Sequence, residues 1–292
     1  MLAPGLLGEK DDFGQRYCGG APEEVAPGVT QWLGSSNLDE LNAVLTRHLM
    51  VRRLKKDVLK ELPPKLHQQI LVDVTAAHAA EIRRIFTALN KIRGDKNLAD
   101  DRKRLAGVEL QRLYVATGNA KISGAVEQVQ ATLDEGQKVI VFAHHLAMLD
   151  GLEQQLGPEH NAIRIDGSTS MDARKQLVDH FQQDPDVRLA ILSITAAGTG
   201  ITLTAAQCVV FAELSWNPGH LIQAEDRAHR VGQKGTVLIR YLHAPGTCDD
   251  IMSALLAKKL KVVGQALDGN SFSSGLTLSK ASLIDEFLAD QL

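Results

Sequence analysis

The sequence predicts an α/β fold: a parallel sheet with helices on both faces, joined to an N-terminal helical linker and a helical protrusion. From residue 121 onward, short continuous apolar segments alternate with segments of helical period, which is typical of strands that are buried on both faces. The 292 residues suffice for a sizeable core, and 44% hydrophobic with 23% charged residues excludes collagen-like, low-complexity and disordered classes. No apolar run approaches the roughly 18 residues that span a bilayer.

The first 116 residues are predicted to be mainly helical. Apolar residues recur at helical spacing over 37–50, so a helix is expected there. Pro63 and Pro64 then break the chain, and the segment that follows, 67–74, has the composition of a strand. Helical spacing resumes at about residue 76 and is interrupted by the charged segment 95–104. This pattern predicts a helical protrusion with an exposed turn, ending at about residue 116.

Each element of the second half follows from its own pattern. Short apolar runs predict strands at 138–143, 163–165, 187–193, 208–213 and 237–242. Helices are predicted from 121 to Gly136, through 146–156, over 171–182, after Pro218 and from Thr247 onward. Capping pairs are expected at two of these helices: Thr169 with Asp172, and Thr247 with Asp250. Ligands of such sheets bind at the carboxyl ends of the strands, so the loops there are searched for functional residues.

Charge and cysteine content narrow the classes of function. The net charge of −3 gives no global sign of a polyanionic partner, although residues 47–60 carry six basic residues against one acid. Both a solvated helix face and a nucleic-acid contact remain open for that segment. Cys18, Cys208 and Cys248 lie far apart, so neither a disulfide framework nor a zinc site is predicted. The chain is expected to work inside a cell.

The helix after Pro218 carries the clearest candidate site. One helical stripe is predicted to be buried: Leu221, Ala224, Ala228 and Val231. A second stripe holds three planar donors: Gln223, Arg227 and Arg230. Planar donors in register can grip phosphate oxygens and neutralise the charge of a transferring phosphoryl group. The alternative is an exposed helix whose arginines pair with Glu225 and Asp226, but these acids do not share the stripe.

Two loops after predicted strands add hydroxyls and glycines. The first contains Ser193, Thr195, Gly198, Thr199 and Gly200. A Gly-Thr-Gly segment is commonly only a turn, but after a buried strand and between hydroxyls it becomes a candidate phosphate contact. The second loop, Asp166, Gly167 and Ser168, ends at a helix N-terminus, which suits an anion, although such a loop alone is most often a capped turn.

Five segments, in order and spacing, resemble the second-lobe motifs of superfamily-two helicase-like ATPases: VFAHH at 141–145, RIDGST at 164–169, LSITAAGTGITL at 192–203, WNP at 216–218 and QAEDRAHRVGQ at 223–233. The last two are similar to a highly specific pattern of SWI/SNF-related DNA translocases. Ile194 and Thr195 stand where remodellers of that family carry a Thr-Arg pair, so the chain resembles the annealing-helicase, fork-remodelling branch. FGQRYC at 13–18 and RRLKKDVLKELPPK at 52–65 resemble the link between the two lobes, and the resemblance fades after about Gly269.

The resemblance implies a RecA-like lobe and a role for each candidate residue. Arg227 and Arg230 would reach the γ-phosphate of ATP, with Gln223 in support. Gly198, Thr199 and Gly200 would lie near the nucleotide cleft. The DNA would be contacted from several loops, by His144, His145, Asp166, Gly167, Ser168, Ser193, Thr195 and Trp216. Trp216 either packs against the DNA groove or anchors the turn at Pro218, and the histidines either contact DNA or end a strand with satisfied hydrogen bonds.

The sequence contains neither a G-x-x-x-x-G-K-[ST] phosphate loop nor an acidic D-E-x-H box. ATP and Mg²⁺ would therefore be bound mainly by a first lobe that this chain lacks. The expected function is the second motor lobe of an ATP-dependent double-stranded DNA translocase, which anneals or remodels branched DNA in repair or replication and is inactive as an ATPase without the first lobe. A stand-alone, non-catalytic DNA-binding or regulatory module is the alternative, and the WNP segment disfavours an RNA helicase.

The expected organisation is a lobe-connecting helical segment over 1–62, a strand and the helical protrusion over 63–116, the RecA-like lobe over 117–268 and a tail over 269–292. Because the chain starts inside a family segment, truncation of a longer protein is expected. Its partners would be double-stranded or branched DNA and the N-terminal lobe of the same protein, without a membrane. A DNA-containing compartment is expected, the nucleus in a eukaryote or the nucleoid in a bacterium. The tail carries an amphipathic segment that would brace the lobe or bind a partner.

Overall fold

The computed structural model describes residues 5–26, 29–32, 34–94, 102–196 and 200–268. The chain divides into two compact units. One consists of Met1–Lys60 with Ala254–Leu292, and the other is Glu61–Ser253. The predicted amphipathic tail, 269–292, lies outside the described residues. Within the described ranges, no helix has both the length and the apolar composition needed to cross a membrane.

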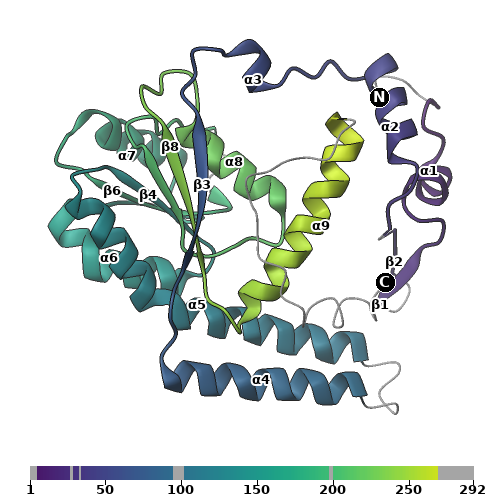
Figure 1. The fold of residues 1–292 in the computed structure, drawn as a ribbon, viewed down its shortest axis with the longest axis horizontal. Coiled ribbons are helices and arrows are strands. Elements are labelled where there is room, and N and C mark those ends of the chain that lie inside the picture. Colours follow the sequence, from purple (N-terminus) through teal and green to yellow (C-terminus); the bar gives the residue numbers. More distant parts are fainter. Residues whose placement is uncertain (1–4, 27–28, 33, 95–101, 197–199, 269–292) are drawn as a thin grey trace. The chain divides into compact units, whose positions relative to one another are not determined.

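The larger unit contains the predicted parallel sheet (Figure 1). Its six strands, in spatial order, are β3 (Lys65–Leu71), β8 (Val237–His243), β7 (Cys208–Phe211), β4 (Val139–Ala143), β6 (Leu189–Ser193) and β5 (Ile163–Ile165). Every neighbouring pair runs parallel. In the central strand β4, Val141 lies beside Ile191 on one side and Val210 on the other. The predicted fold class is confirmed, and the carboxyl ends of all six strands lie at one edge.

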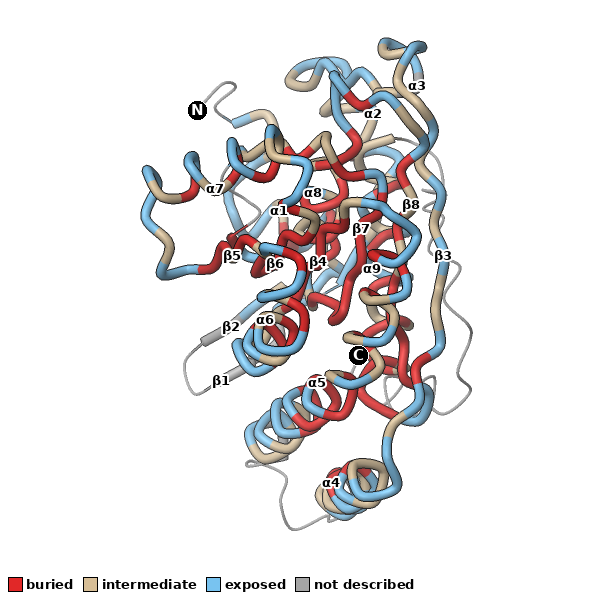
Figure 2. Tube along the Cα trace, turned by 90° about the vertical axis from the view of Figure 1, so that its left-hand side faces the viewer, coloured by how far each residue is buried: buried red, intermediate tan, exposed pale blue. Residues whose placement is uncertain are grey.

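Helices cover both faces of this sheet, because its central strands are apolar on both sides. The helices of the unit are α4 (Ala76–Gly94), α5 (Arg102–Asp134), α6 (Leu146–His160), α7 (Met171–Gln183) and α8 (Pro218–Ala228), and α9 (Cys248–Asp268) begins in it. Figure 2 shows α5 and α6 on one face and α7 and α8 on the other. Every residue of β4, β6 and β7 is buried, as strands between two helical layers require.

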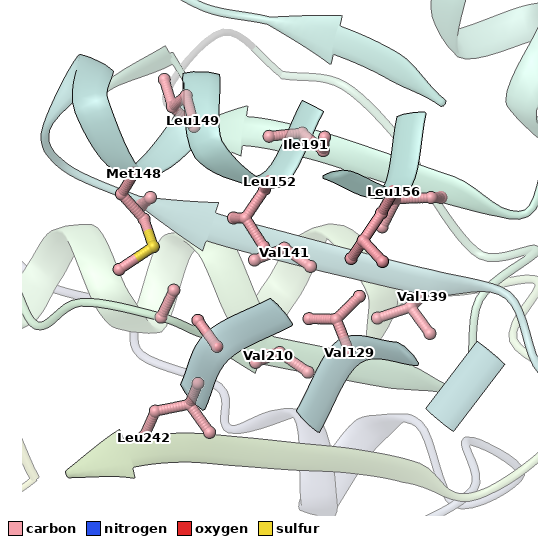
Figure 3. Packing of buried hydrophobic residues seen from close by; sticks show 14 of the residues in the cluster. Val129, Val139, Val141, Met148, Leu149, Leu152, Leu156, Ile191, Val210 and Leu242 are labelled. Atoms are coloured by element: carbon pink, nitrogen blue, oxygen red, sulfur yellow. The ribbon is translucent and has the colours of Figure 1, made fainter. Parts of the chain in front are cut away.

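The main hydrophobic core lies between the sheet and the helices α5 and α6. Figure 3 shows Leu152 and Leu156 of α6 over Val139 and Val141 of β4. Burying each such side chain contributes about 1.5–3 kcal/mol. On the opposite face, the rings of Phe142, Phe211 and Tyr241 stack in a row, with centroids 5.3 Å and 4.6 Å apart. Because side chains alternate along each strand, the sheet contributes to a hydrophobic core on each of its two faces.

The smaller unit is built from short elements held by polar contacts. They are α1 (Lys10–Tyr17), β1 (Glu23–Ala26), β2 (Val29–Gln31), α2 (Leu38–His48) and α3 (Lys55–Val58), together with the later part of α9. Arg16 and Tyr17 of α1 both bond the carboxylate of Glu40 in α2, at 2.7 and 2.9 Å. The helix expected over 37–50 is confirmed as α2. The antiparallel pair β1–β2 was not predicted, since only helices and loops were expected here.

Three local predictions need correction. The protrusion and the first helix of the lobe were expected as separate helices, but α5 runs unbroken from Arg102 to Asp134 and is closed by Gly136 at a φ of +81°. Thr169 does not cap α7. Ser170 does, with its hydroxyl accepting from Ala173 N at 3.3 Å, while the Thr169 hydroxyl accepts from Asp166 N at 3.0 Å.

The capping pair expected at the start of α9 is half correct. The hydroxyl of Thr247 accepts from Asp249 N at 3.2 Å, so it does cap the helix. The carboxylate of Asp250 does not return to Thr247. It accepts instead from Gly246 N at 2.8 Å and contacts His243 Nε2 at 2.8 Å. The Asp250 carboxylate therefore accepts from the backbone N–H of the residue before Thr247 and not from that of Thr247 itself.

Candidate nucleotide and DNA interface

Helix α8 positions the candidate arginines. Pro218 opens the helix, and the side chain of Asn217 caps it by accepting from Gly219 N at 2.9 Å. Its apolar stripe is buried as predicted at Leu221, Ala224 and Ala228. The stripe ends there, because the helix ends at Ala228 and Val231 is 68% exposed. The prediction that Val231 is buried is therefore wrong.

Arg227 and Arg230 reach the same short segment of backbone. Arg227 Nη1 donates to Ile201 O at 3.4 Å, and Arg230 Nη1 donates to Thr202 Oγ1 at 3.2 Å. Burial and the nearby charge of Arg230 lower the pKa of Arg227. Arg227 Nε is buried without a hydrogen-bond partner among the described residues. Two adjacent cations with donor capacity to spare form a local site for an anion.

The three donors do not form one helical comb, as the sequence suggested. Gln223 is exposed on α8 one turn before Arg227, whereas Arg230 lies on the turn beyond the helix. The chain leaves the helix at His229, with φ −85° and ψ 76°. Gly200, which directly precedes the segment that the arginines contact, has a φ of +75° and is exposed. Gly198 and Thr199, also expected near the nucleotide, lie outside the described residues.

Gln233 holds this region together, and sequence reasoning missed it. Its side chain is buried and joins the end of α8 to the segment before β7. Nε2 donates to the carbonyls of Thr204, Ala206 and Ala228 at 3.2, 2.9 and 3.2 Å. Oε1 accepts from Lys234 N at 2.8 Å and Gly235 N at 3.1 Å. A single amide therefore satisfies backbone groups that no helix or strand could pair.

Among the described residues, the acids of α8 form no ion pair with the arginines, although the charge of Asp226 favours the charged form of Arg227. Glu225 is 2% exposed and faces β3 and β8, where it bonds Lys65, His67 Nε2 at 3.1 Å and the hydroxyl of Tyr241 at 2.5 Å. Burial alone would raise the pKa of Glu225, but the hydrogen bond from His67 and the charge of Lys65 outweigh it and lower the pKa to about 2. Asp226 lies 3.7 Å from Lys65 Nζ.

A second group of candidate residues gathers at the carboxyl ends of β4 and β7. The backbone N–H groups of His144 and His145 both donate to Glu213 Oε2, at 2.8 and 2.9 Å, and His145 Nδ1 lies 2.6 Å from Glu213 Oε1. Glu213 is 2% exposed. Burial opposes its ionisation, but these hydrogen bonds and the His145 charge lower its pKa. Burial, aided by His145, lowers the pKa of His144.

Tyr114 of α5 completes this group, and no sequence signal pointed to it. Its ring lies 4.5 Å from the ring of His145, 5.2 Å from that of His144 and 5.4 Å edge-on from Trp216. Its hydroxyl donates to Leu214 O at 2.6 Å. Trp216 itself is half-buried, so its indole is both packed on Tyr114 and partly accessible.

The remaining candidates follow β5 and β6. The carboxylate of Asp166 accepts from Ser168 N at 2.9 Å, from the Ser168 hydroxyl at 2.6 Å and from Arg164 Nε at 3.0 Å, and the Ser168 bonds lower its pKa. Asp166 thus organises the loop, while Gly167 and Ser168 are exposed. Ser193 is the last residue of β6 and is buried, and its hydroxyl lies 2.9 Å from that of Thr195, which is exposed.

The candidate residues therefore form two groups. The residues proposed for DNA lie at the carboxyl ends of β4, β5, β6 and β7. The arginine pair lies at the far end of α8, about 15 Å along the helix from Trp216. In the described part of the chain, no three His, Cys, Asp or Glu side chains cluster as metal ligands would. The arginine group offers donors suited to phosphate oxygens rather than ligands suited to a metal.

Known proteins are similar to this chain along most of its length. Residues 121–232 match the family model of the helicase conserved C-terminal domain. The chain is 43% identical over 272 residues to the DNA annealing helicase and endonuclease ZRANB3 of Homo sapiens, covering 92% of this chain and 25% of that protein. It is 41% identical over 270 residues to the SWI/SNF-related matrix-associated actin-dependent regulator of chromatin subfamily A-like protein 1 of Xenopus tropicalis, covering 91% and 28%.

A solved structure shares the fold. The Sulfolobus solfataricus SWI2/SNF2 ATPase core in complex with dsDNA matches with a TM-score of 0.58 and 25% identity, covering 97% of this chain and 61% of that one. The chain spans about a quarter of the length of the human relative. The chain therefore carries the helicase conserved C-terminal domain over residues 121–232, and along about nine tenths of its length it is similar to part of the SWI/SNF-related annealing helicases.

Proposed function

We propose that this chain is the second motor lobe of an ATP-dependent double-stranded DNA translocase that anneals or remodels branched DNA in repair or replication. The observation that carries the proposal is the arginine pair. Arg227 and Arg230 converge on residues 201–202, and neither forms an ion pair with a carboxylate within the described ranges. Guanidinium donors left in this state suit the γ-phosphate of ATP, whose charge rises during phosphoryl transfer.

The proposed lobe supplies only half of the nucleotide site. Arg227 and Arg230 hold phosphate oxygens in this proposal, and Gln223 supports them. Gly198, Thr199 and Gly200 are assigned to the nucleotide cleft from the sequence resemblance alone. A phosphate loop and Mg²⁺ ligands belong to a first lobe, because this sequence contains no phosphate loop and the described residues form no metal-ligand cluster. When bound, Mg²⁺ neutralises phosphate charge during the transfer. The chain alone is proposed to be inactive as an ATPase.

The DNA-facing surface of the proposal is the carboxyl edge of the sheet. The loops after β4, β5, β6 and β7 begin at this edge, and Gly167, Ser168 and Thr195 are exposed on them. Trp216 and the two histidines add aromatic surface beside these loops. Closure of two lobes on ATP would shift one DNA grip relative to the other and convert hydrolysis into steps along the duplex. The similar Sulfolobus solfataricus structure, which contains dsDNA, supports this assignment.

The proposal extends to organisation and place of action. We keep 1–62 as the lobe-connecting segment, 63–116 as a strand with the protrusion, 117–268 as the lobe and 269–292 as the tail. The partners are double-stranded or branched DNA and an N-terminal RecA-like lobe of the same protein. The proposed place of action is a DNA-containing compartment, the nucleus of a eukaryote or the nucleoid of a bacterium.

ATP hydrolysis by two proteins, with and without duplex and forked DNA, tests the proposal. One is this chain, and the other is this chain joined to the N-terminal lobe of a similar SWI2/SNF2 ATPase. We expect hydrolysis, stimulated by DNA, only in the joined protein. Hydrolysis by the chain alone would contradict the half-site. Binding of DNA without hydrolysis in either protein would favour the alternative, a non-catalytic DNA-binding or regulatory module.

A further inference from the structure

One face of α5 contacts the carboxyl ends of β4, β7 and β8, where some of the residues proposed for DNA lie. Tyr114, Gly118 and Lys121 follow one another at spacings of four and three residues, so they share a helix face. Tyr114 is 2% exposed and contacts the rings of both histidines and of Trp216.

Gly118 is where α5 comes closest to the buried carboxylate. A Cβ at this position would lie well inside van der Waals distance of Glu213 Oε1 and 3.1 Å from His145 Nδ1. The helix can therefore reach the Glu213–His145 pair only because residue 118 has no side chain. Glu213 in turn accepts from the backbone of both histidines, so a displacement of its carboxylate moves the loop after β4.

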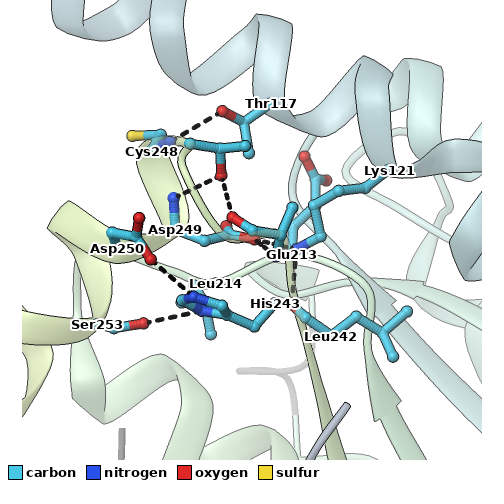
Figure 4. A network of polar contacts seen from close by, with 12 residues as sticks. Thr117, Lys121, Glu213, Leu214, Leu242, His243, Cys248, Asp249, Asp250 and Ser253 are labelled. Carbon is cyan, nitrogen blue, oxygen red and sulfur yellow. Dashed lines mark hydrogen bonds and ion pairs between the residues drawn. The ribbon is translucent and has the colours of Figure 1, made fainter. Parts of the chain in front are cut away.

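Buried polar contacts fix the next turn of the same face. Lys121 is fully buried and bonds Leu242 O at 2.7 Å and Asp249 Oδ2 at 2.7 Å. The hydroxyl of Thr117 accepts from Cys248 N at 3.1 Å. Figure 4 shows Thr117 and Lys121 on α5 facing the ends of β7 and β8 and the start of α9. This end of the face cannot move without breaking a buried ion pair.

The N-terminal part of α5 packs against α4 and forms a helical hairpin with it. Residues 102–113 continue the same helix away from the sheet, and α4 lies alongside it (Figure 1). Ile82, Ile85 and Leu89 of α4 are buried at 1%, 5% and 1% exposure, which makes the hairpin a packed unit. A single unbroken helix thus connects this hairpin to the residues proposed to contact DNA.

We propose that Tyr114 and Gly118 are positioning residues, through which α5 sets the geometry of His144, His145 and Trp216 at the DNA-facing edge. Tyr114 fixes the rings of His145 and Trp216 through edge-on contacts, and its hydroxyl fixes the loop after β7 through Leu214 O. Gly118 fixes the depth at which the helix meets Glu213. The consequence for DNA rests on the proposed function, but the positioning itself does not.

Trp216 fluorescence tests the positioning without ATP or DNA. The sequence has two tryptophans, so a Trp32→Phe background leaves Trp216 as the only one. Gly118→Ala is compared with Gly107→Ala, which lies in the same helix and whose added Cβ meets nothing within 4 Å. Both changes raise helix propensity equally. We expect a red-shifted emission and stronger acrylamide quenching for Gly118→Ala only. Unchanged Trp216 emission in a folded Gly118→Ala protein would overturn the inference.

Duplex binding by the full chain tests the consequence. We expect Gly118→Ala to raise the Kd for duplex DNA about tenfold, because base or sugar contacts of the aromatic group are lost, and Gly107→Ala to leave it unchanged. A shifted Trp216 emission with unchanged duplex affinity would overturn the link to DNA. Absence of duplex binding by the unmodified chain would instead contradict the proposed function, and the fluorescence comparison would still decide the positioning.

Two variants of Tyr114 guard against failure of Gly118→Ala to fold. Tyr114→Phe keeps the ring contacts and loses only the bond to Leu214 O, whereas Tyr114→Leu loses the rings. We expect Tyr114→Leu to reproduce the shift and the tenfold loss, and Tyr114→Phe to show a smaller change in both, because it keeps the ring contacts and loses only the bond to the loop after β7. Wild-type emission and duplex affinity in Tyr114→Leu would contradict the proposal.

Discussion

Arg227 and Arg230 are held in different ways, which suggests a division of labour. Arg227 is half-buried and fixed to a backbone carbonyl, and burial lowers its pKa without removing its charge at neutral pH. Arg230 is exposed, and among the described residues it bonds only the hydroxyl of Thr202. The first arginine is preorganised, while the second can turn toward a ligand at small cost. Arg230 is therefore the better variant for separating catalysis from folding.

Arg230→Ala should lower DNA-stimulated ATP hydrolysis about 10³-fold in a protein that contains both lobes, because the charge of the transferring phosphoryl group loses an arginine. Duplex affinity should be unchanged, since the arginine pair lies away from the carboxyl edge. Steady-state kinetics and a binding titration measure the two effects. Arg112→Ala removes an arginine that is 62% exposed and serves as the control. Wild-type turnover in Arg230→Ala would reject the assignment.

The Lys121–Asp249 pair predicts a large stability effect. Both side chains are almost fully buried, at 0% and 3% exposure. Lys121→Met should lower the free energy of unfolding by about 3–5 kcal/mol, because Asp249 keeps its buried charge without a cation. Lys121→Met with Asp249→Asn should recover part of that loss. Urea unfolding of both single variants and the double variant gives the coupling, and strictly additive losses would contradict a direct interaction.

Sequence reasoning singled out the arginines but did not point to Tyr114 or Gln233. The arginines were singled out because they lie in one short segment with planar donors that suit phosphate, although the single helical stripe expected for them does not form, and their role stays a prediction. Tyr114 acts on Leu214, which is 100 residues away, and Gln233 acts on backbone carbonyls. Such partners leave no local pattern, because any residue has a carbonyl. The roles given to the histidines and Trp216 stay predictions, although their placement at one edge agrees with the expected topology.

Among the elements, β3 and α8 are joined by a buried acid, and this makes their contact sensitive to acid. The pKa of Glu225 is lowered to about 2, against about 4.3 for an unfolded chain. Its contribution to stability is therefore present above about pH 4.3 and is lost as the pH falls toward 2. His229 Nε2, bonded to Pro63 O at 2.8 Å, fixes the same segment before β3.

Glu225→Gln should remove this acid sensitivity. At pH 7 the variant should lose about 2–3 kcal/mol of unfolding free energy, because Lys65 keeps its charge without the carboxylate. Between about pH 4.3 and 2.5 the difference from the wild type should shrink as Glu225 becomes protonated. Urea unfolding across this range measures both, with the exposed Glu61→Gln as control. A difference that stays constant with pH would contradict the lowered pKa.

At this scale the sheet was predictable and the helix ends were not. Five strands of the sheet were located because short apolar runs are typical of strands between two helical layers. The sixth, β3, is partly exposed along its length and was indicated instead by the break at Pro63 and Pro64. The end of α8 was missed by about one turn, since the side chain of Gln233 takes the carbonyl of Ala228 and no helix-breaking residue marks the place. The break expected within α5 does not exist, because Thr117 and Gly118 tolerate a helix when tertiary contacts hold them.

For the molecule as a whole, a net charge of −3 makes general attraction to DNA weak. Binding should depend on local phosphate contacts, and for about four contacted phosphates the association constant should fall about a hundredfold between about 50 and 200 mM salt. Trp216→Ala should lower the association constant by the same factor at every salt concentration. The slope of its logarithm against the logarithm of the salt concentration should stay unchanged, because the variant removes no charge. Titrations with a labelled duplex measure both quantities. Affinity independent of salt would contradict backbone recognition.

The unbroken helix α5 has a geometric consequence for the hairpin it carries. Its 33 residues extend about 50 Å, and each residue advances the helix by about 100°. One residue inserted between Gly107 and Tyr114 would swing α4 through about 100° around the helix axis, whereas seven would return it to within about 20° and carry it about 10 Å farther out. The hairpin can therefore lengthen while α4 keeps its angular position around the axis of α5 only in steps of about two helical turns.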